Sequence, residues 1–342
     1  MRKIVDDERL IFKCCSLYYQ DEIGQKEICD ILEISRPTVS RMLKLGKELG
    51  IVKIEISNPD NLVYGKMERE IEKKFNLREV IIVPSAPIYD GKVLLNPELG
   101  RAALKFMARI LRNGQYVGVS MGMTLHNIVN ADYFVEDSVD CTFVPVLGGV
   151  GESRLEIHSN YLVQEFAEIF GGECVQLFSP AIFSQRSLLE KFLQEKTIQK
   201  VTKLFQKLDV IIMGIGVPIS EYSTVLQSGY ADHKTLEKFA ERGAVGDIIL
   251  RYFDIEGNTE PFTEFNERVG GINLEHLKKI SCRVGVATGK HKINAVTGAI
   301  NGKFINVLIT DVDCAEGLLH YSDDYGYKNK ATKRASTKNK FS

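Results

Sequence analysis

Glycine-rich turns follow four short apolar runs in the C-terminal two thirds of the chain. Glycine lets backbone N–H groups approach an anion closely, and a helix that begins after such a turn adds a favourable dipole. The turns lie at residues 121–125, 147–151, 214–216 and 288–290. The candidate contacts in them are Gly122, Met123, Thr124, Leu125, Gly148, Gly149, Gly214, Gly216 and Gly289, with Ser120 just before the first turn. They predict a phosphate-binding site, although tight packing alone explains any single glycine turn.

Four polar side chains accompany these turns. Lys292 follows the last turn and offers an ammonium group, whereas His158, Asn160 and Asp247 offer groups that hydrogen-bond to sugar hydroxyls. The joint occurrence of turns and polar groups favours a ligand site over packing. The turns match neither the Walker A nor the G-x-G-x-x-G pattern, which disfavours a nucleotide. No cysteine and histidine group has the spacing of metal ligands, so we predict neither a metal nor a cofactor.

A second chemical feature is a basic stretch near the N-terminus. The whole chain has a net charge of −1, but residues 36–53 contain five basic residues and one acid. Such a stretch attracts DNA phosphates and lets arginine read guanine. We assign base contacts to Arg36, Ser40 and Arg41, phosphate contacts to Gln25, Thr38, Lys44 and Lys47, and a helix cap to Ser35. The alternative is a small helical bundle with a solvated charged face.

Helical periodicity positions this basic stretch. Apolar spacing predicts helices at residues 8–20, 25–32 and 36–49, with Ile28, Ile31 and Leu32 facing inward from the second. Residues 33–35 form the turn before the third helix, and residues 51–56 alternate as an exposed strand does. Three helices followed by a strand predict a winged helix-turn-helix.

Short apolar runs alternate with helical stretches from residue 80 onward. Strands are predicted at residues 80–83, 116–120, 141–146, 174–178, 210–213, 283–287 and 306–310, and helices at 97–112, 159–170, 188–206 and 292–300. This alternation predicts an α/β fold with a doubly wound parallel sheet, in which ligands bind at the carboxyl ends of strands. We therefore expect a DNA-binding domain at 1–57, an effector-binding and oligomerisation domain at 58–322 that begins with a connector helix at 62–75, and a disordered basic tail at 323–342.

Composition restricts the class of protein. The 342 residues are 44% hydrophobic and 26% charged, as in ordinary globular proteins. No apolar run approaches the ~20 residues of a spanning helix, and the charged N-terminus does not read as a signal peptide. Seven cysteines without a C-x-x-C pair indicate free, mostly buried thiols in a reducing compartment. We expect a cytoplasmic protein without a membrane partner.

Residues 17–54 resemble the N-terminal domain of the SorC family of bacterial sugar-responsive regulators, which includes deoxyribonucleoside and central glycolytic regulators. The segment 35–41 (SRPTVSR) and the following Gly50-Ile51-Val52 contribute most to the resemblance, which continues through Leu319. It implies an effector domain that is similar to sugar-phosphate isomerases and binds phosphorylated sugars without turning them over. It also implies a homodimer or homotetramer on double-stranded operator DNA.

The resemblance assigns roles to individual residues. Ser120, Gly122, Thr124 and Leu125 match the phosphate loop, Gly148 and Gly149 match a Pro-x-x-Gly-Gly turn, and His158 and Asn160 match a polar helix start. Lys292 would pair with the phosphate and Asp247 would accept hydrogen bonds from sugar hydroxyls. The glycolytic branch has an arginine where this chain has Leu147, and no arginine follows Gly216 closely. These departures predict a monophosphate ligand.

Two other functions fit the same residues. One is an isomerase-like enzyme with an appended helix-turn-helix, in which Asp247 or Asp311 would serve as the base. However, Asp311 precedes an apolar helical stretch and equally fits a helix cap. The other is a DNA-binding protein whose α/β domain only oligomerises. We favour a regulator in which the effector shifts the population of DNA-binding states.

Overall fold

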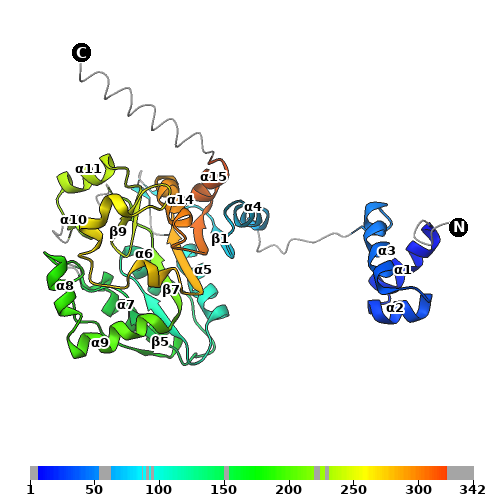
Figure 1. Cartoon of the computed structure of the whole chain (residues 1–342), viewed down its shortest axis with the longest axis horizontal. Helices are drawn as coiled ribbons and strands as arrows, with labels where there is room; N and C mark the ends of the chain where they lie inside the picture. The colour runs from blue at the N-terminus through cyan, green and yellow to red at the C-terminus, as the bar shows by residue number, and fades with distance from the viewer. Residues whose placement is uncertain are drawn as a thin grey trace, which may run out of the picture. The chain divides into compact units, whose positions relative to one another are not determined.

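The chain consists of two compact units. The computed structural model describes residues 7–53, 63–86, 88–89, 92–93, 96–149, 154–218, 224–227 and 231–321. The units comprise Met1–Val63 and Tyr64–Ser342, and both can be followed by colour in Figure 1. The predicted basic tail, 323–342, lies outside the described residues.

The N-terminal unit contains three helices, α1 (Glu8–Tyr19), α2 (Gln25–Leu32) and α3 (Arg36–Glu48). All three were predicted to within one residue. Their shared core consists of Ile11, Cys14, Cys15, Ile28, Val39, Met42 and Leu43. Ile31 was predicted to face inward, but it is 45% exposed, because Ile28, Cys29 and Leu32 already form the α2 side of this small core.

The expected wing strand is not found where the structure describes the chain. Residues 51–53 form a bend and an irregular segment, and the remaining residues of the predicted strand, 54–56, lie outside the described residues. The Val52 N–H donates to the Gly46 carbonyl at 2.9 Å, so this stretch packs back against the end of α3. That contact uses a backbone donor that a strand would need for pairing.

The C-terminal unit is built on a parallel sheet of seven strands in the order β1-β11-β10-β7-β4-β5-β6. These strands are β1 (Glu79–Val83), β4 (Tyr116–Val119), β5 (Thr142–Pro145), β6 (Glu173–Cys174), β7 (Leu208–Gly214), β10 (Cys282–Ala287) and β11 (Val307–Asp311). Two small antiparallel hairpins accompany it, β2 (Ile88–Tyr89) with β3 (Lys92–Val93) and β8 (Gly246–Ile248) with β9 (Arg251–Phe253). The sheet confirms the predicted α/β architecture.

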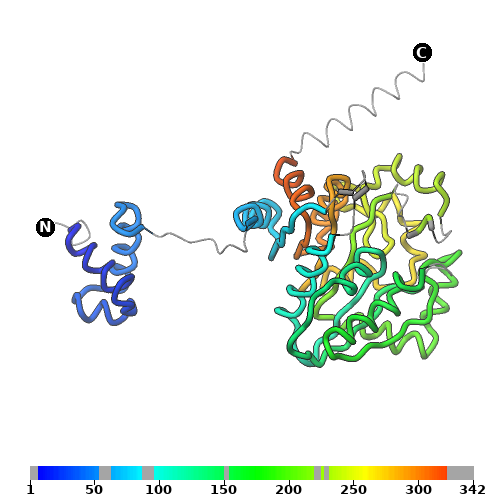
Figure 2. The backbone as a smooth tube through the Cα atoms, turned by 180° about the vertical axis from the view of Figure 1, so that it is seen from behind, coloured from blue at the N-terminus to red at the C-terminus, as the bar shows by residue number. Residues whose placement is uncertain are grey.

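Helices cover both faces of the sheet, as the opposite views of Figures 1 and 2 show. One face packs against α5 (Pro97–Ile110), α6 (Met123–Val129) and α7 (Ser159–Phe170). The other packs against elements that include α4 (Gly65–Phe75), α9 (Lys196–Thr202), α11 (His233–Glu241), α14 (Ile293–Asn301) and α15 (Val312–Leu319). The shorter helices are α8 (Arg186–Phe192), α10 (Thr224–Gln227), α12 (Thr263–Asn266) and α13 (Leu274–Leu277), with 3₁₀ turns η2 (Leu155–Ile157), η3 (Lys203–Lys207), η4 (Glu260–Phe262) and η5 (Lys290–Lys292). Near-continuous apolar strands are buried between these two layers.

Several predicted bounds were wrong. The strand predicted at 174–178 is only Glu173–Cys174, because the Asn160 amide group takes the backbone N–H and C=O of Leu177. The single helix predicted at 188–206 consists of α8, α9 and η3. Helix α6 was not predicted, since residues 123–125 were expected to be loop and instead form its first turn.

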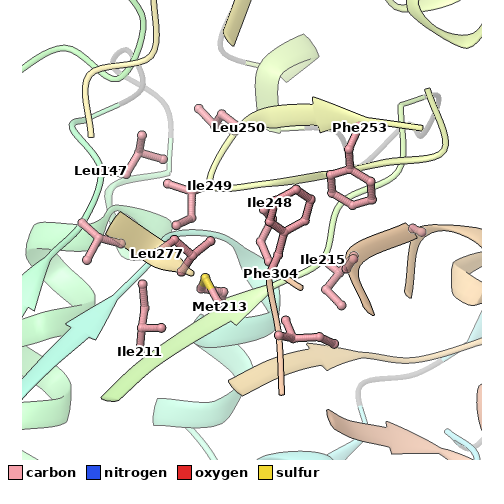
Figure 3. Packing of buried hydrophobic residues seen from close by; sticks show 14 of the residues in the cluster. Leu147, Ile211, Met213, Ile215, Ile248, Ile249, Leu250, Phe253, Leu277 and Phe304 are labelled. Atoms are coloured by element: carbon pink, nitrogen blue, oxygen red, sulfur yellow. The ribbon is translucent and has the colours of Figure 1, made fainter. Parts of the chain in front are cut away.

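The strand order changes direction between β4 and β7. From β4 the chain adds strands outward through β5 and β6, and it then returns to β7 on the other side of β4 and continues through β10 and β11. The carboxyl ends of strands at such a switch point border a crevice in open α/β sheets. Hairpin β8–β9 covers this region, and Figure 3 shows Ile249 of its turn near Met213 of β7.

Candidate functional site

A cavity of about 150 Å³ lies at the carboxyl ends of β4 and β7. Residues after β4, β7 and β10 reach it, together with the β8–β9 hairpin and α10. The described residues that line it are Ser120, Met121, Gly122, Met123, Thr124, Gly214, Ile215, Gly216, Val217, Val225, Asp247, Ile249, Leu250 and Lys292. The structure thus brings together eight of the residues selected from the sequence.

Lys292 and Asp247 are the charged groups of this lining. The Lys292 Nζ donates to the Ile215 carbonyl oxygen at 2.7 Å, which holds the ammonium at the end of β7. Burial lowers the pKa of Lys292, and the nearby Asp247 carboxylate opposes that change. Burial raises the pKa of Asp247 to about 6, although Lys292 and the Leu250 N–H both favour its charged form. The two groups, both half-buried, therefore stabilise each other's charged form.

The turn after β4 supplies backbone donors. Gly122 precedes α6 with a φ of 121°, a conformation that favours glycine. No side-chain hydrogen bond caps α6 there, and the first amides of a helix have no partner within the helix. The Gly122 N–H itself donates to the Ile157 carbonyl at 2.9 Å, which fixes the turn against η2. Amides and the Thr124 hydroxyl are thus available beside Lys292.

Gly214 and Gly216 differ in their surroundings. A Cβ on Gly216 would overlap the Asp247 carboxylate, whereas a Cβ on Gly214 would lie 3.5 Å from the Thr124 Cβ, an ordinary contact. Gly216 and Asp247 also exchange backbone hydrogen bonds, N–H to C=O, at 2.9 and 3.2 Å. The glycine at 216 is therefore required for the position of the carboxylate.

The β8–β9 turn is a strained part of the cavity wall. Ile249 and Leu250 both have left-handed backbone conformations, with φ of 51° and 58°. Two-residue hairpin turns of this kind normally use asparagine and glycine, because larger residues cost about 1–2 kcal/mol each. The Leu250 N–H donates to Asp247, and the buried Arg251 guanidinium donates to the Ile249 carbonyl at 3.4 Å. These bonds hold two apolar side chains at the cavity.

Six predicted effector contacts do not line the cavity. Leu125 is buried in the core beneath α6, and the Gly289 N–H donates to the Asp311 carboxylate. The N–H groups of Gly148 and Gly149 donate to the Gly270 and Ser179 carbonyls. His158 precedes α7 with a buried Nε2, and Asn160 uses its side-chain amide to join α7 to Leu177.

Six lining residues were missed by the sequence analysis: Met121, Ile215, Val217, Val225, Ile249 and Leu250. All are apolar, and apolar residues next to a buried strand equally fit the core. The positions of Met121, Ile215 and Val217 beside the glycines of the turns after β4 and β7 were the available signal. No comparable signal marked the β8–β9 turn.

The predicted DNA-contacting residues lie on α2, the following turn and α3. Arg36, Ser40, Arg41, Lys44 and Lys47 are exposed, and Gln25 is partly buried. Ser35 occupies the cap position of α3, but its hydroxyl hydrogen-bonds to the partly buried Thr38 hydroxyl at 2.8 Å rather than to a backbone N–H. Lys44 pairs with Glu48 at 3.7 Å, and the Lys47 Nζ lies 5.7 Å from the centre of the Tyr19 ring. The outer side of α3 is thus basic, while its inner side is apolar.

Comparison with known proteins identifies the larger unit. Residues 63–320 match the model of the Sugar-bind family of sugar-binding domains. The chain is 29% identical over 318 residues to the deoxyribonucleoside regulator of Bacillus subtilis (strain 168), covering 92% of this chain and 98% of the relative. The chain belongs to the SorC/DeoR family of sugar-binding transcriptional regulators.

Both units have counterparts in this family. The sorbitol operon regulator of Klebsiella pneumoniae is also 29% identical over 318 residues, which cover 92% of this chain and 98% of the relative. The crystal structure of that full-length regulator, SorC, aligns with a TM-score of 0.67 over 92% of this chain and 99% of the other. The SorC/DeoR likeness therefore includes most of the N-terminal unit as well as the α/β unit. Among the described helices, none is long and apolar enough to cross a membrane.

Proposed function

We propose that the protein is a DNA-binding transcriptional regulator whose operator affinity is controlled by a phosphorylated sugar bound in the cavity of the α/β unit. The observation on which this rests is the cavity at the strand-order switch, which the Lys292 ammonium and the first residues of α6 line together. Family membership supports it, since relatives regulate operons and one is named for sorbitol.

Phosphate and sugar would occupy different parts of the cavity. Lys292 and the amides of Met123 and Thr124 suit the phosphate, because charge-assisted bonds to an ammonium and N–H groups are strong where water is excluded. Asp247 suits sugar hydroxyls, since a carboxylate only accepts hydrogen bonds. Val217, Ile249 and Leu250 would contact the carbon chain.

A monophosphate fits better than a bisphosphate. Among the described residues that line the cavity, Lys292 is the only basic one. Leu147, where the glycolytic branch has an arginine, is 1% exposed and packs in the core. The sequence 217–230 contains neither lysine nor arginine. A second phosphate would therefore lack a cationic partner.

The N-terminal unit would bind the operator through α3. A helix of this kind inserts its exposed residues into the major groove, and a dimer reads two half-sites about one helical turn, ~34 Å, apart. The exposed Arg36, Ser40 and Arg41 suit base edges, and Gln25, Lys44 and Lys47 suit phosphates. We expect a homodimer or homotetramer in which ligand binding shifts the population of DNA-binding states.

Two measurements on the full chain test the proposal. The first is retardation of the promoter fragment upstream of its own gene, with a scrambled fragment as control. The second is a thermal-shift series with deoxyribose 5-phosphate, glucose 6-phosphate, fructose 6-phosphate and fructose 1,6-bisphosphate, since a ligand of the folded state must raise stability. Failure in both would refute the proposal, and clear preference for the bisphosphate would refute its monophosphate part.

The hydrogen bonds of Asp311, one of the two candidate bases, favour the regulator over the isomerase-like enzyme. The Asp311 carboxylate accepts from the Gly289 N–H at 2.9 and 3.0 Å and from the Cys314 N–H at 3.0 Å, so it caps α15. Asp247 does not separate the two functions, because the charged form that Lys292 favours is also the form that a general base needs. An assay of sugar-phosphate isomerisation would separate the two functions.

A further inference from the structure

Helix α4 attaches to the edge of the sheet through two carboxylates. Glu72 accepts a hydrogen bond from the Val80 N–H and Glu68 accepts one from the Ile82 N–H, both at 2.9 Å. β1 is the edge strand of the described sheet, and edge strands otherwise leave such donors open. Ile71, from the same side of α4, is 0% exposed. Helix α4, which follows the N-terminal unit in the chain, is therefore held in a fixed position against β1.

Lys74 joins α4 to the end of α15. Its Nζ donates to the carbonyls of Leu318, Leu319 and Tyr321 at 3.0, 2.8 and 2.7 Å. The last carbonyls of a helix have no partner within it, and a cation there is favourable. The last turn of α15 has no basic residue of its own, so Lys74 supplies the charge. Both views show α4 beside α15 (Figures 1 and 2).

The other end of α15 reaches the turn that carries Lys292. Asp311 caps α15 and also accepts the Gly289 N–H, and Gly289 precedes η5, which ends at Lys292. A Cβ on Gly317 would overlap Ile293 of α14, so α15 packs closely against its neighbour. One end of α15 thus contacts the turn that carries Lys292, and the other end contacts Lys74.

We propose that Lys74 is the positioning residue through which ligand binding in the cavity shifts the position of α4 on β1, and with it the start of the segment that joins α4 to the N-terminal unit. This inference rests on the proposed function. A phosphate bound by the remaining N–H groups of the Lys292 ammonium draws this group, and with it η5, toward the ligand. The resulting shift of η5 moves Asp311 and α15, because close-packed elements move as units. Lys74 then transfers that movement to α4.

The test is the ratio of operator affinities without and with ligand, measured on the full chain. The DNA probe is the fragment upstream of its own gene, and the ligand probe is the sugar monophosphate of the thermal-shift series that stabilises the chain most. Coupling between sites is typically about 5- to 150-fold. We expect Lys74→Met to reduce the ratio to less than about one third of the parent's, while ligand affinity stays within about twofold.

Three comparisons make the test specific. Lys73→Met, on an exposed neighbour in α4, should keep the parent ratio, and Lys74→Arg, which can still donate to the carbonyls, should restore most of it. In hydrogen exchange, ligand should alter the rates of α4 amides in the parent but not in Lys74→Met. An unchanged ratio in Lys74→Met, or an equal loss in Lys73→Met, would overturn this inference alone. A parent chain that binds neither probe would overturn the proposed function and this inference with it.

Discussion

The two units use positive charge in opposite ways. In the N-terminal unit, Arg41, Lys44 and Lys47 are exposed on α3, where their field extends into solvent. In the α/β unit, a single ammonium, Lys292, lies in a cavity beside a carboxylate. Exposed cations attract a polyanion over a long range and are screened by salt. A half-buried cation in a small cavity binds one small anion, because only a ligand that fits the cavity reaches it.

The hydrophobic cores of the two units also differ in size. The described part of the N-terminal unit has seven buried hydrophobic residues, whereas the α/β unit has a large hydrophobic cluster on each face of its sheet. Small domains bury a smaller fraction of their surface and have less stability to lose. A packing defect should therefore unfold the first unit and leave the second folded, so the units can be perturbed separately.

The largest effect is expected for Gly46→Val. A Cβ at this position of α3 would overlap the Cys15 thiol of α1, and a branched side chain adds further crowding. Overpacking of this kind typically costs about 1–3 kcal/mol, a large share of the stability of so small a unit. Operator retardation should be lost, while the melting transition of the α/β unit and its shift with ligand stay as in the parent.

Gly24→Ser is the matched control. Gly24 caps α2, nothing lies within 4 Å of a Cβ there, and serine is a good capping residue. It should bind the operator as the parent does. If Gly46→Val also lowered the stability of the α/β unit, the two units would not be independent.

Lys292→Met should weaken ligand binding and leave operator binding intact. Methionine is one atom shorter than lysine and lacks the charged donor. Hydrogen bonds to charged groups contribute about 1.5–3 kcal/mol, or about 10- to 150-fold in affinity. Calorimetric titration with the best sugar monophosphate measures the loss. Lys290→Met removes an ammonium whose side chain is 73% exposed and should bind normally. Equal losses in both variants would show a general charge effect rather than a cavity contact.

Arg41→Ala should weaken operator binding and leave ligand binding intact. A bidentate arginine–guanine contact is worth about 1–3 kcal/mol of discrimination, so operator affinity should fall by about 5- to 150-fold with ligand affinity unchanged. Lys13→Ala removes an exposed cation on α1 and serves as control, to be measured by retardation at one fixed salt concentration. Unchanged operator binding in Arg41→Ala would remove this residue from the proposed interface.

Local patterns predicted much of the fold. Helix α7 was placed without error at 159–170, because its apolar spacing and the following Gly171 mark both ends. The buried strands were found because each is a short apolar run between turn residues. Helix α6 was missed, since its seven residues follow a glycine turn that also fits a loop.

The cavity was predictable only in part. Gly122, Gly216 and Lys292 lie far apart in sequence and meet because β4, β7 and β10 are neighbours, an order that no local pattern encodes. Asn160 shows the limit for polar residues: an amide that could bind a ligand instead bonds both backbone groups of Leu177. Ile249 and Leu250 could not be found, because large apolar residues rarely occupy a left-handed turn.

The smallest effect concerns pH and Asp247. Its pKa in the folded chain is about 6, above the ordinary 3.8, so the folded state takes up this proton more readily than the unfolded chain. Protonation therefore adds stability as the pH falls through 6, and this contribution is absent above it. Between pH 7.5 and 5.5 the gain is about 0.8 kcal/mol, which raises the melting temperature by about 2 °C. His291, whose pKa burial lowers, acts in the opposite direction, so the difference between the parent and Asp247→Asn isolates the carboxylate. The difference in melting temperature between the two proteins should become smaller as the pH falls. Parallel pH profiles of the two proteins would show that the surroundings of Asp247 do not raise its pKa.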